Sequence, residues 1–185
     1  MPALIFVCML TMIASTRALD AQSERPMEIY AGYSYLDDPS NAVLAITTRD
    51  DQFRVGWAAG LAWPIGTWLS AVGEASGHYK RKTSFDDDVH VSFHACMGGP
   101  RVSARVGRLT EFAQLLAGAT HAHASAFGID VGVTAFSLQP GGGVDYPIAS
   151  RLSARLELDY RWLRQSAEGR AHASQFRAVA AIVYR

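Results

Sequence analysis

The sequence predicts an all-β protein, an eight-stranded antiparallel up-and-down transmembrane β-barrel. Three observations lead to this fold class. Apolar and polar residues alternate with period 2 along most of the chain after residue 28. Short and long connections between the alternating segments follow one another strictly. Beyond the N-terminus, no segment has the ~18 uninterrupted apolar residues of a membrane-spanning helix.

Residues 1–21 are interpreted as a signal peptide. The chain is apolar from Ala3 to Ala14 with only Thr11 interrupting, which is too short for the roughly 20 residues of a spanning helix. Small residues around Thr16-Arg17-Ala18 offer a cleavage site, although no Lys or Arg precedes the apolar run. We therefore expect an exported chain whose mature domain covers approximately residues 22–185.

Four strands are predicted in the first half of the mature chain. Residues 28–36 form a weak first strand, residues 52–63 alternate clearly, and residues 68–79 are rich in Gly and aromatics. Residues 89–97 alternate again, with apolar side chains opposite His, Ser and Cys. After Gly98-Gly99-Pro100 the apolar positions change from odd to even, so we expect a one-residue bulge there.

Four more strands are predicted in the second half. Residues 110–123 are the least regular because Leu115-Leu116 breaks the alternation, and residues 134–146 are moderately clear. Residues 151–164 give the clearest pattern, since leucines and aromatics alternate with charged residues of both signs. Residues 176–184 form the last strand.

The connections between these strands alternate in length. Tight turns are predicted at residues 64–66, 106–108 and 147–149, and longer, mostly more polar loops at 37–51, 80–88, 124–133 and 165–173. Antiparallel strands connected in this way place the termini and all short turns at one end and the longer loops at the other, as in outer-membrane barrels.

The aromatic residues favour a membrane barrel with its apolar faces outward. Many of them fall near strand ends on apolar faces, where rings lie at a lipid headgroup boundary. The residues expected at these interfaces are Trp57, Trp63, Tyr79, Tyr160, Trp162 and Tyr184. The alternative is a soluble periplasmic barrel that binds an apolar ligand, which predicts an apolar lumen and a charged exterior.

An outward apolar face places the charged residues of the strands inside a narrow lumen. Because eight strands enclose a space that side chains just fill, these charges must meet and pair. The predicted structural network consists of Glu74, Arg101, Arg105, Arg155, Glu157, Asp159, Arg161 and Arg177. We expect this network largely to plug the lumen, so a stable open pore is not predicted.

The order of several motifs resembles bacterial outer-membrane β-barrel domain proteins of the small OmpA-like type. The motifs are Phe93, Gly98-Gly99-Pro100-Arg101, Phe112, Gly118, Gly141-Gly142-Gly143-Val144-Asp145, and Arg155 through Asp159-Tyr160. The likeness covers about residues 28–184. It implies an eight-stranded barrel that the outer-membrane assembly machinery inserts. Such chains often end on an aromatic residue, whereas here Arg185 follows Tyr184.

Composition and motifs argue against most other functions. Seventeen Lys and Arg against seventeen Asp and Glu give no net charge, so a nucleic-acid partner is not expected. The glycines at 141–143 lack the features of a phosphate loop and are expected to relieve crowding beside bulky lumen residues. Asp86-Asp87-Asp88 lacks the spaced ligands of a calcium site. No cofactor is expected.

Histidines provide the remaining candidate sites. The order His123-x-Ser125 in an eight-stranded barrel resembles lipid A deacylases, in which a His activates a Ser nucleophile. No supporting carboxylate is evident nearby, and Ala126 stands where that family is expected to have a polar residue. The pairs His90/His94 and His121/His123 share strand faces but have no third ligand, so no metal site is predicted.

The sequence therefore predicts a monomeric, non-enzymatic protein of the bacterial outer membrane. We expect it to contact the lipid bilayer and lipopolysaccharide, and to have a structural or surface-interaction role through its long loops. An adhesin is one form of that role. The sequence names no ligand or receptor.

Overall fold

The structure, a computed structural model, describes residues 26–37, 52–53, 55–84, 87–126, 129–164 and 172–185. Within these residues, no helix is long and apolar enough to cross a membrane. The elements formed by the described residues are all strands: β1 (Glu28–Asp37), β2 (Gln52–Phe53), β3 (Val55–Pro64), β4 (Leu69–Ser84), β5 (Asp87–Val106), β6 (Leu109–Ala126), β7 (Ile129–Pro147), β8 (Leu152–Arg164) and β9 (His172–Tyr184).

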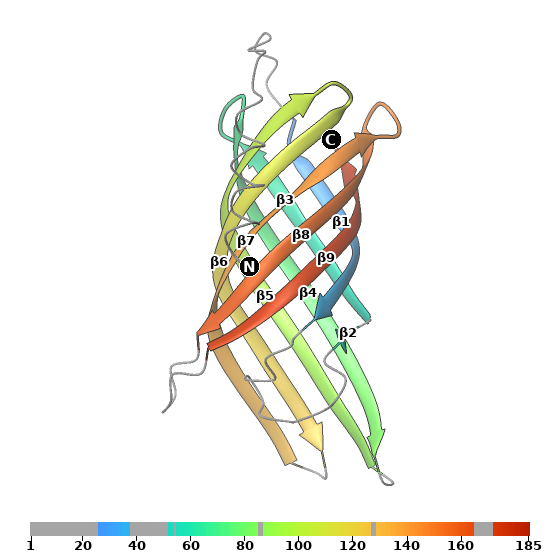
Figure 1. Ribbon diagram of the computed structural model, residues 1–185, viewed down its shortest axis with the longest axis vertical. Coiled ribbons are helices and arrows are strands. Elements are labelled where there is room, and N and C mark those ends of the chain that lie inside the picture. Colours follow the sequence, from blue (N-terminus) through green and yellow to red (C-terminus); the bar gives the residue numbers. More distant parts are fainter. Residues whose placement is uncertain (1–25, 38–51, 54, 85–86, 127–128, 165–171) are drawn as a thin grey trace, which may run out of the picture.

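Each strand pairs antiparallel with the next in sequence, and β1 also pairs with β9, so the sheet closes into a barrel (Figure 1). β2 and β3 are two parts of one strand, because both pair with β1. Counted in this way the barrel has eight strands, which confirms the predicted fold class. Closure leaves no free sheet edge within the barrel wall, as a lipid environment requires.

Among the described pairs of β1 with β2 and β3, the register changes once, between Phe53 and Trp57. Trp57 pairs with Tyr33, whereas Phe53 pairs with Leu36, so four steps along one strand face three along the other. One extra residue on one strand is the signature of a β-bulge.

The prediction of a bulge at Gly98-Gly99-Pro100 is wrong. β5 keeps one register with β4 from Met97, opposite Glu74, to Arg101, opposite Ser70. Phe93, Met97 and Arg101 are all buried and therefore share one inward face. The expectation that apolar side chains face outward is thus also wrong for this part of β5. The hydropathy pattern changes because the lumen beside β5 is apolar near Phe93 and ionic near Arg101, while the strand itself continues unchanged.

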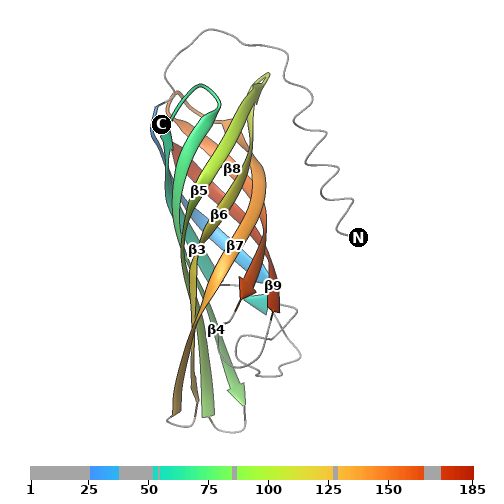
Figure 2. The same cartoon turned by 90° about the vertical axis from the view of Figure 1, so that its left-hand side faces the viewer.

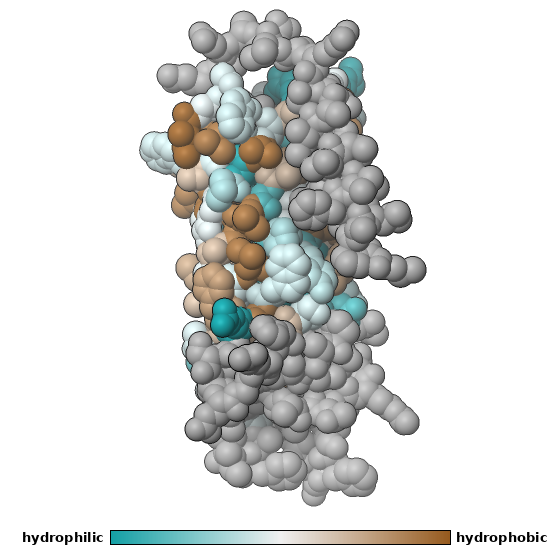
Figure 3. All heavy atoms as spheres, turned by 60° about the vertical axis from the view of Figure 1, so that its left-hand side comes forward, coloured by the Kyte–Doolittle hydropathy of each residue, from teal (hydrophilic) through white to brown (hydrophobic). Residues whose placement is uncertain are grey.

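On β8 and β9 the faces match the prediction. Residues of β8 alternate between exposed and buried, with Leu156, Leu158 and Tyr160 exposed and the charged residues between them buried. On β9, Arg177 is buried and Ile182 is exposed. Figure 3 shows apolar side chains along much of the outer wall that it displays.

The two ends of the barrel differ in construction. At the turn end, which holds Arg185 and is uppermost in Figure 1, β5 and β6 are joined by a tight turn in which Gly107 has a φ of 62°, a backbone conformation that favours glycine. At the loop end, β4–β7 extend further than predicted, through most of the expected loops 80–88 and 124–133. These four strands therefore continue past the other strands (Figures 1 and 2).

Candidate functional site

The lumen brings together most of the charged residues that the sequence predicted there. Arg105 differs, because it is exposed at the turn end of β5, where the strand has passed the closed part of the barrel. The other seven are buried: Glu74, Arg101, Arg155, Glu157, Asp159, Arg161 and Arg177.

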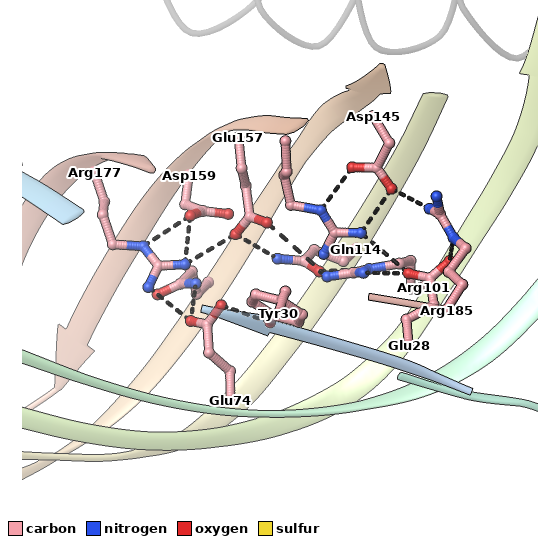
Figure 4. Close-up of polar contacts among 12 residues, drawn as sticks. Glu28, Tyr30, Glu74, Arg101, Gln114, Asp145, Glu157, Asp159, Arg177 and Arg185 are labelled. Carbon is pink, nitrogen blue, oxygen red and sulfur yellow. Dashed lines mark hydrogen bonds and ion pairs between the residues drawn. The ribbon is translucent and has the colours of Figure 1, made fainter. Parts of the chain in front are cut away.

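Arg177 lies at one end of the network, where it contacts three carboxylates (Figure 4). Its Nη1 lies 2.7 Å from Oε1 of Glu74, and its Nη2 lies 3.0 Å from Oε1 of Glu157. Its Nε and Nη2 both contact Oδ2 of Asp159, at 2.8 and 2.7 Å. The three carboxylates come from β4 and β8, so one guanidinium on β9 connects opposite sides of the barrel. Such contacts to a charged donor are the stronger kind of hydrogen bond.

A second group of charges lies nearer the turn end. Arg155 donates to both oxygens of Asp145, from Nε at 2.7 Å and from Nη2 at 2.9 Å. Nη2 of Arg155 also lies 3.1 Å from Oε2 of Glu28. Arg185 donates from Nε to Oε1 of Glu28 at 2.8 Å and contacts Asp145 as well. It thus connects β9 with β1 across the closing seam and with β7.

Aromatic rings and an amide join the two groups of charges. The guanidinium carbon of Arg101 lies 4.3 Å from the ring centre of Phe112, and that of Arg155 lies 4.5 Å from the same ring. This distance is within the range of cation–π attraction. Gln114 accepts from Nε of Arg101 at 2.9 Å and donates to Oε1 of Glu157 at 3.0 Å. Tyr30 donates to Oε2 of Glu74 at 2.8 Å.

The buried charges balance. Four arginines, at 101, 155, 161 and 177, face four carboxylates, at 74, 145, 157 and 159, all of them 5% exposed or less. Glu28 and Arg185 add one more charge of each sign at the turn end. Because burial of an unpaired charge is costly, a balanced and hydrogen-bonded set is the arrangement that a narrow lumen tolerates.

Toward the loop end the lumen changes from ionic to polar and then to apolar. Arg161 donates from Nε to Oε1 of Gln139 at 2.8 Å, and His78 Nε2 lies 2.8 Å from Oγ of Ser34. Beyond them, closer to the loop end, is a cluster of buried apolar side chains, which we call the apolar layer: Leu36, Phe93, Ala122, Ala135, Leu163 and Ala173.

The sequence analysis missed three members of the network: Glu28, Asp145 and Arg185. Asp145 was quoted as part of the glycine motif, but its position on the inward face of β7 could have been found from its two-residue spacing from Gly143. Glu28 and Arg185 lie at the ends of the first and last strands, where no pattern indicated their direction. Of the motif glycines, Gly141 fits its expected role, because a Cβ there would lie 1.7 Å from Oδ1 of Asp159.

The residues predicted for the membrane interfaces all lie on the outer wall. Between 39% and 61% of each is exposed: Trp57, Trp63, Tyr79, Tyr160, Trp162 and Tyr184. Trp63 and Tyr184 belong to the turn end of their strands, and the other four lie nearer the loop end. The outer wall therefore has aromatic residues at two levels, with leucines such as Leu156 and Leu158 between them.

The structure places the other candidate residues as follows. Ser125 pairs with Asp130 across β6 and β7, so a residue with a carboxylate does stand opposite the serine, although the side chain of Asp130 lies outside the described ones. The His90 side chain and Asp86-Asp87-Asp88 also lie outside the described side chains. Among the described residues, no three His, Cys, Asp or Glu side chains converge as metal ligands.

Comparisons with known proteins agree with this geometry. The model of the outer membrane protein β-barrel domain family matches residues 6–181. No curated protein sequence matches the chain. The structure of Ail, the attachment invasion locus protein of Yersinia pestis, is 13% identical, with a TM-score of 0.55, over 85% of this chain and 97% of Ail.

Two further solved structures are similar in fold. Ail in complex with the heparin analogue sucrose octasulfate is 15% identical, with a TM-score of 0.58, over 85% of this chain and 97% of Ail. Neisserial surface protein A is 9% identical, with a TM-score of 0.64, over 88% of this chain and 99% of that protein. At these identities the likeness shows a shared fold.

Proposed function

This chain belongs to the outer membrane protein β-barrel domain family and is therefore an outer-membrane protein, and we propose a surface role for it. In this proposal the protein performs no catalysis and presents its loop end to partners at the cell surface. The observation that carries this proposal is the extension of β4–β7 beyond the other strands (Figures 1 and 2). In a barrel of this family the short turns face the periplasm and the longer connections face outward.

The extension offers backbone edges as well as side chains. β3 begins to pair with β4 at Tyr79, and β8 ends its pairing with β7 at Phe136. Among the described strands, residues 80–84 and 129–135 therefore have a strand neighbour on one side only. Exposed strand edges are surfaces on which an extended segment of another protein can add by backbone hydrogen bonds.

We propose further that the lumen is closed to ions. Two features support this proposal. The charges around Arg177 pair with one another inside the narrow lumen, and the apolar layer covers them on the loop side. The same reasoning assigns the network a structural role. Planar-bilayer recordings of the folded barrel should show no steady conductance, and a stable open state would remove this part of the proposal.

The remaining parts of the proposal concern biogenesis and surroundings. Residues 1–21 act as the export signal, the assembly machinery inserts the mature chain, and the barrel is a monomer in contact with phospholipid and lipopolysaccharide. The two levels of exposed aromatic residues support the membrane contact. Mass spectrometry of the mature N-terminus tests the cleavage position, and light scattering in detergent tests the oligomeric state.

A binding assay with shortened hairpins tests the surface role. Heparin is a rational first probe, because Ail, a barrel of similar fold, is described in complex with a heparin analogue, and because β4 of the extension carries the basic run Lys80-Arg81-Lys82. Replacing residues 81–90 and 123–132 by two-residue turns should remove binding of heparin or of host cells. The altered barrel should keep its heat-dependent gel mobility. Undiminished binding by the shortened, folded barrel would contradict the proposal.

A second candidate function is hydrolysis of a lipid ester. Ser125 and His123 lie two residues apart on one face of β6, and Asp130 pairs with Ser125 across the strands. A serine, a histidine and a carboxylate are the groups that nucleophilic ester hydrolysis requires. This function predicts that the wild-type barrel releases fatty acid from lipopolysaccharide and that Ser125→Ala does not. The surface role predicts no release by either.

A further inference from the structure

The outer wall of the barrel has a polar patch that the proposed surface role does not use. Most outward positions hold apolar or small residues, but near the loop end of β5, β6 and β7 the outward positions hold Ser92, His94, His121, His123 and Thr134. We call these five residues the histidine patch. His121 lies two residues beyond Ala119, the partner of the exposed Phe136, so the patch begins at the level of the loop-side aromatic residues.

The rings of His94 and His121 turn away from each other. The two residues are direct partners across β5 and β6. However, the ring of His94 packs edge-on against Tyr79 on β4, with centres 5.5 Å apart. Nδ1 of His121 instead lies 2.9 Å from Oγ1 of Thr134 on β7. This hydrogen bond orients the His121 ring toward β7 and leaves its Nε2 for another partner.

Gly132 provides the space in which His121 and His123 converge. It is the partner of His123 across β6 and β7. A Cβ on Gly132 would lie 3.4 Å from Nε2 of His121 and 3.9 Å from Nδ1 of His123. One nitrogen from each ring therefore borders the same point above the glycine, where any larger residue would crowd the His121 ring.

We propose that His121 and His123 form a binding site for a divalent transition metal ion such as Cu²⁺ or Zn²⁺. Neutral imidazole is the commonest protein ligand for these ions, whereas Mg²⁺ and Ca²⁺ prefer oxygen ligands. The described side chains of the patch include no carboxylate and no permanent positive charge, which argues against a hard cation or an anion. With two protein ligands, water fills the remaining positions.

Thr134 acts as a positioning residue in this site. Metal-bound histidines usually have their second ring nitrogen in a hydrogen bond, which fixes the ring and sets which nitrogen binds the metal. The contact between Nδ1 of His121 and Thr134 is of this kind. The inference is independent of the surface role, since it concerns the wall of the barrel and not the tips of the hairpins.

Titration with Cu²⁺ tests the site. Residues 22–185, folded in detergent without an affinity tag, should bind one more Cu²⁺ ion per chain than the His121→Ala/His123→Ala double variant. Calorimetry measures this number. Each single variant, His121→Ala or His123→Ala, should weaken binding at least ~10-fold, and Thr134→Val should weaken it by about 10-fold. Electron paramagnetic resonance of the bound Cu²⁺ should report nitrogen ligands.

Two further variants make the result decisive. His94→Ala removes an imidazole from the same patch and should leave Cu²⁺ affinity unchanged, because its ring faces Tyr79. Gly132→Val leaves both imidazoles in place and should abolish binding by filling the space between them. Heat-dependent gel mobility checks that each variant folds. Equal Cu²⁺ binding by the wild type and the double variant, or an equal loss in His94→Ala, would overturn the proposal. His121 has no part in the hydrolase arrangement, so its variant separates the two ideas.

Discussion

The same strands form both the turn-side half of the lumen and its loop-side end, but the first region is ionic and the second is apolar. In the turn-side half, Arg177 and Arg155 bind carboxylates from other strands at 2.7–3.1 Å. At the loop-side end, Phe93, Leu163 and their neighbours form the apolar layer. On β5 one inward face contributes to both regions, with Phe93 in the layer and Arg101 in the network.

Each region therefore depends on a different property of its residues. An ion pair needs a specific partner at a specific distance, so loss of one member leaves a buried charge unmatched. An apolar layer needs volume, so a similar apolar side chain can replace another at small cost. The following variants test that contrast, from the largest expected effect to the smallest.

Removal of Arg177, which contacts three carboxylates, should have the largest effect. Arg177→Leu leaves Glu74, Glu157 and Asp159 without their shared cation, and we expect it to lower the free energy of unfolding by about 3–5 kcal/mol. Urea titration of the barrel in phospholipid vesicles measures the change. Arg105→Leu is the matched control, because Arg105 is exposed, and it should change stability by less than about 1 kcal/mol. Equal losses in the two variants would contradict the assignment of the network.

Truncation in the apolar layer should have the next largest effect. Leu163→Ala creates a cavity at a position that is 2% exposed, and we expect a loss of about 2–4 kcal/mol in the same titration. Leu158→Ala, on the outer face of the same strand, should lose less, because lipid can fill the space left at a site that is 57% exposed. A larger loss for Leu158→Ala would reverse the assigned faces of β8.

Addition of one methyl group in the ionic half should cost about 1–3 kcal/mol. Gly141→Ala places a Cβ against Oδ1 of Asp159 and pushes that carboxylate away from Arg177. Gly66→Ala is a suitable control, since nothing lies within 4 Å of its added Cβ. Thermal unfolding in detergent compares the two. If Gly141→Ala were as stable as Gly66→Ala, the crowding between β7 and β8 would be absent.

A volume-conserving change among the inward apolar residues should have the smallest effect. Met97→Leu keeps a buried apolar side chain of similar size beside Val72 and Leu116, and we expect a loss below about 1.5 kcal/mol. Arg161→Met also keeps a long side chain, but it should lower the free energy of unfolding more, because it leaves Gln139 without its charged donor. Comparable losses in the two would erase the contrast between apolar and ionic regions.

Much of this fold follows from the sequence, because period-2 alternation is a local property. The order of residues in segments 151–164 and 52–63 shows this alternation, and Pro and Gly residues between strands indicate the tight turns. The inward network also follows where charges of both signs alternate with leucines, as between Arg155 and Arg161. These inferences require only that one face of a strand differs from the other.

The rest depends on position in the closed barrel, which local pattern does not contain. Alternation at Phe93 and Met97 indicates a strand but not which face is inside, because both residues belong to clusters of buried apolar side chains within the lumen. The extension of β4–β7 falls in segments for which the sequence predicts loops, because their residues are mostly polar and do not alternate clearly with apolar ones. The partners of Arg185 come from the register across the closing seam, which joins residues 157 positions apart.

Each described strand keeps one inward face even where its hydropathy inverts, and contacts with lipid test this assignment most directly at β5. Nuclear Overhauser effects between detergent acyl chains and protein methyl groups can be measured on the unmodified barrel. We expect such contacts for the methyl groups of Leu156 and Leu158, which are exposed, and none for those of Ala95 and Met97, which are buried. Acyl-chain contacts to Ala95 and Met97 equal to those of the β8 leucines would contradict the assignment.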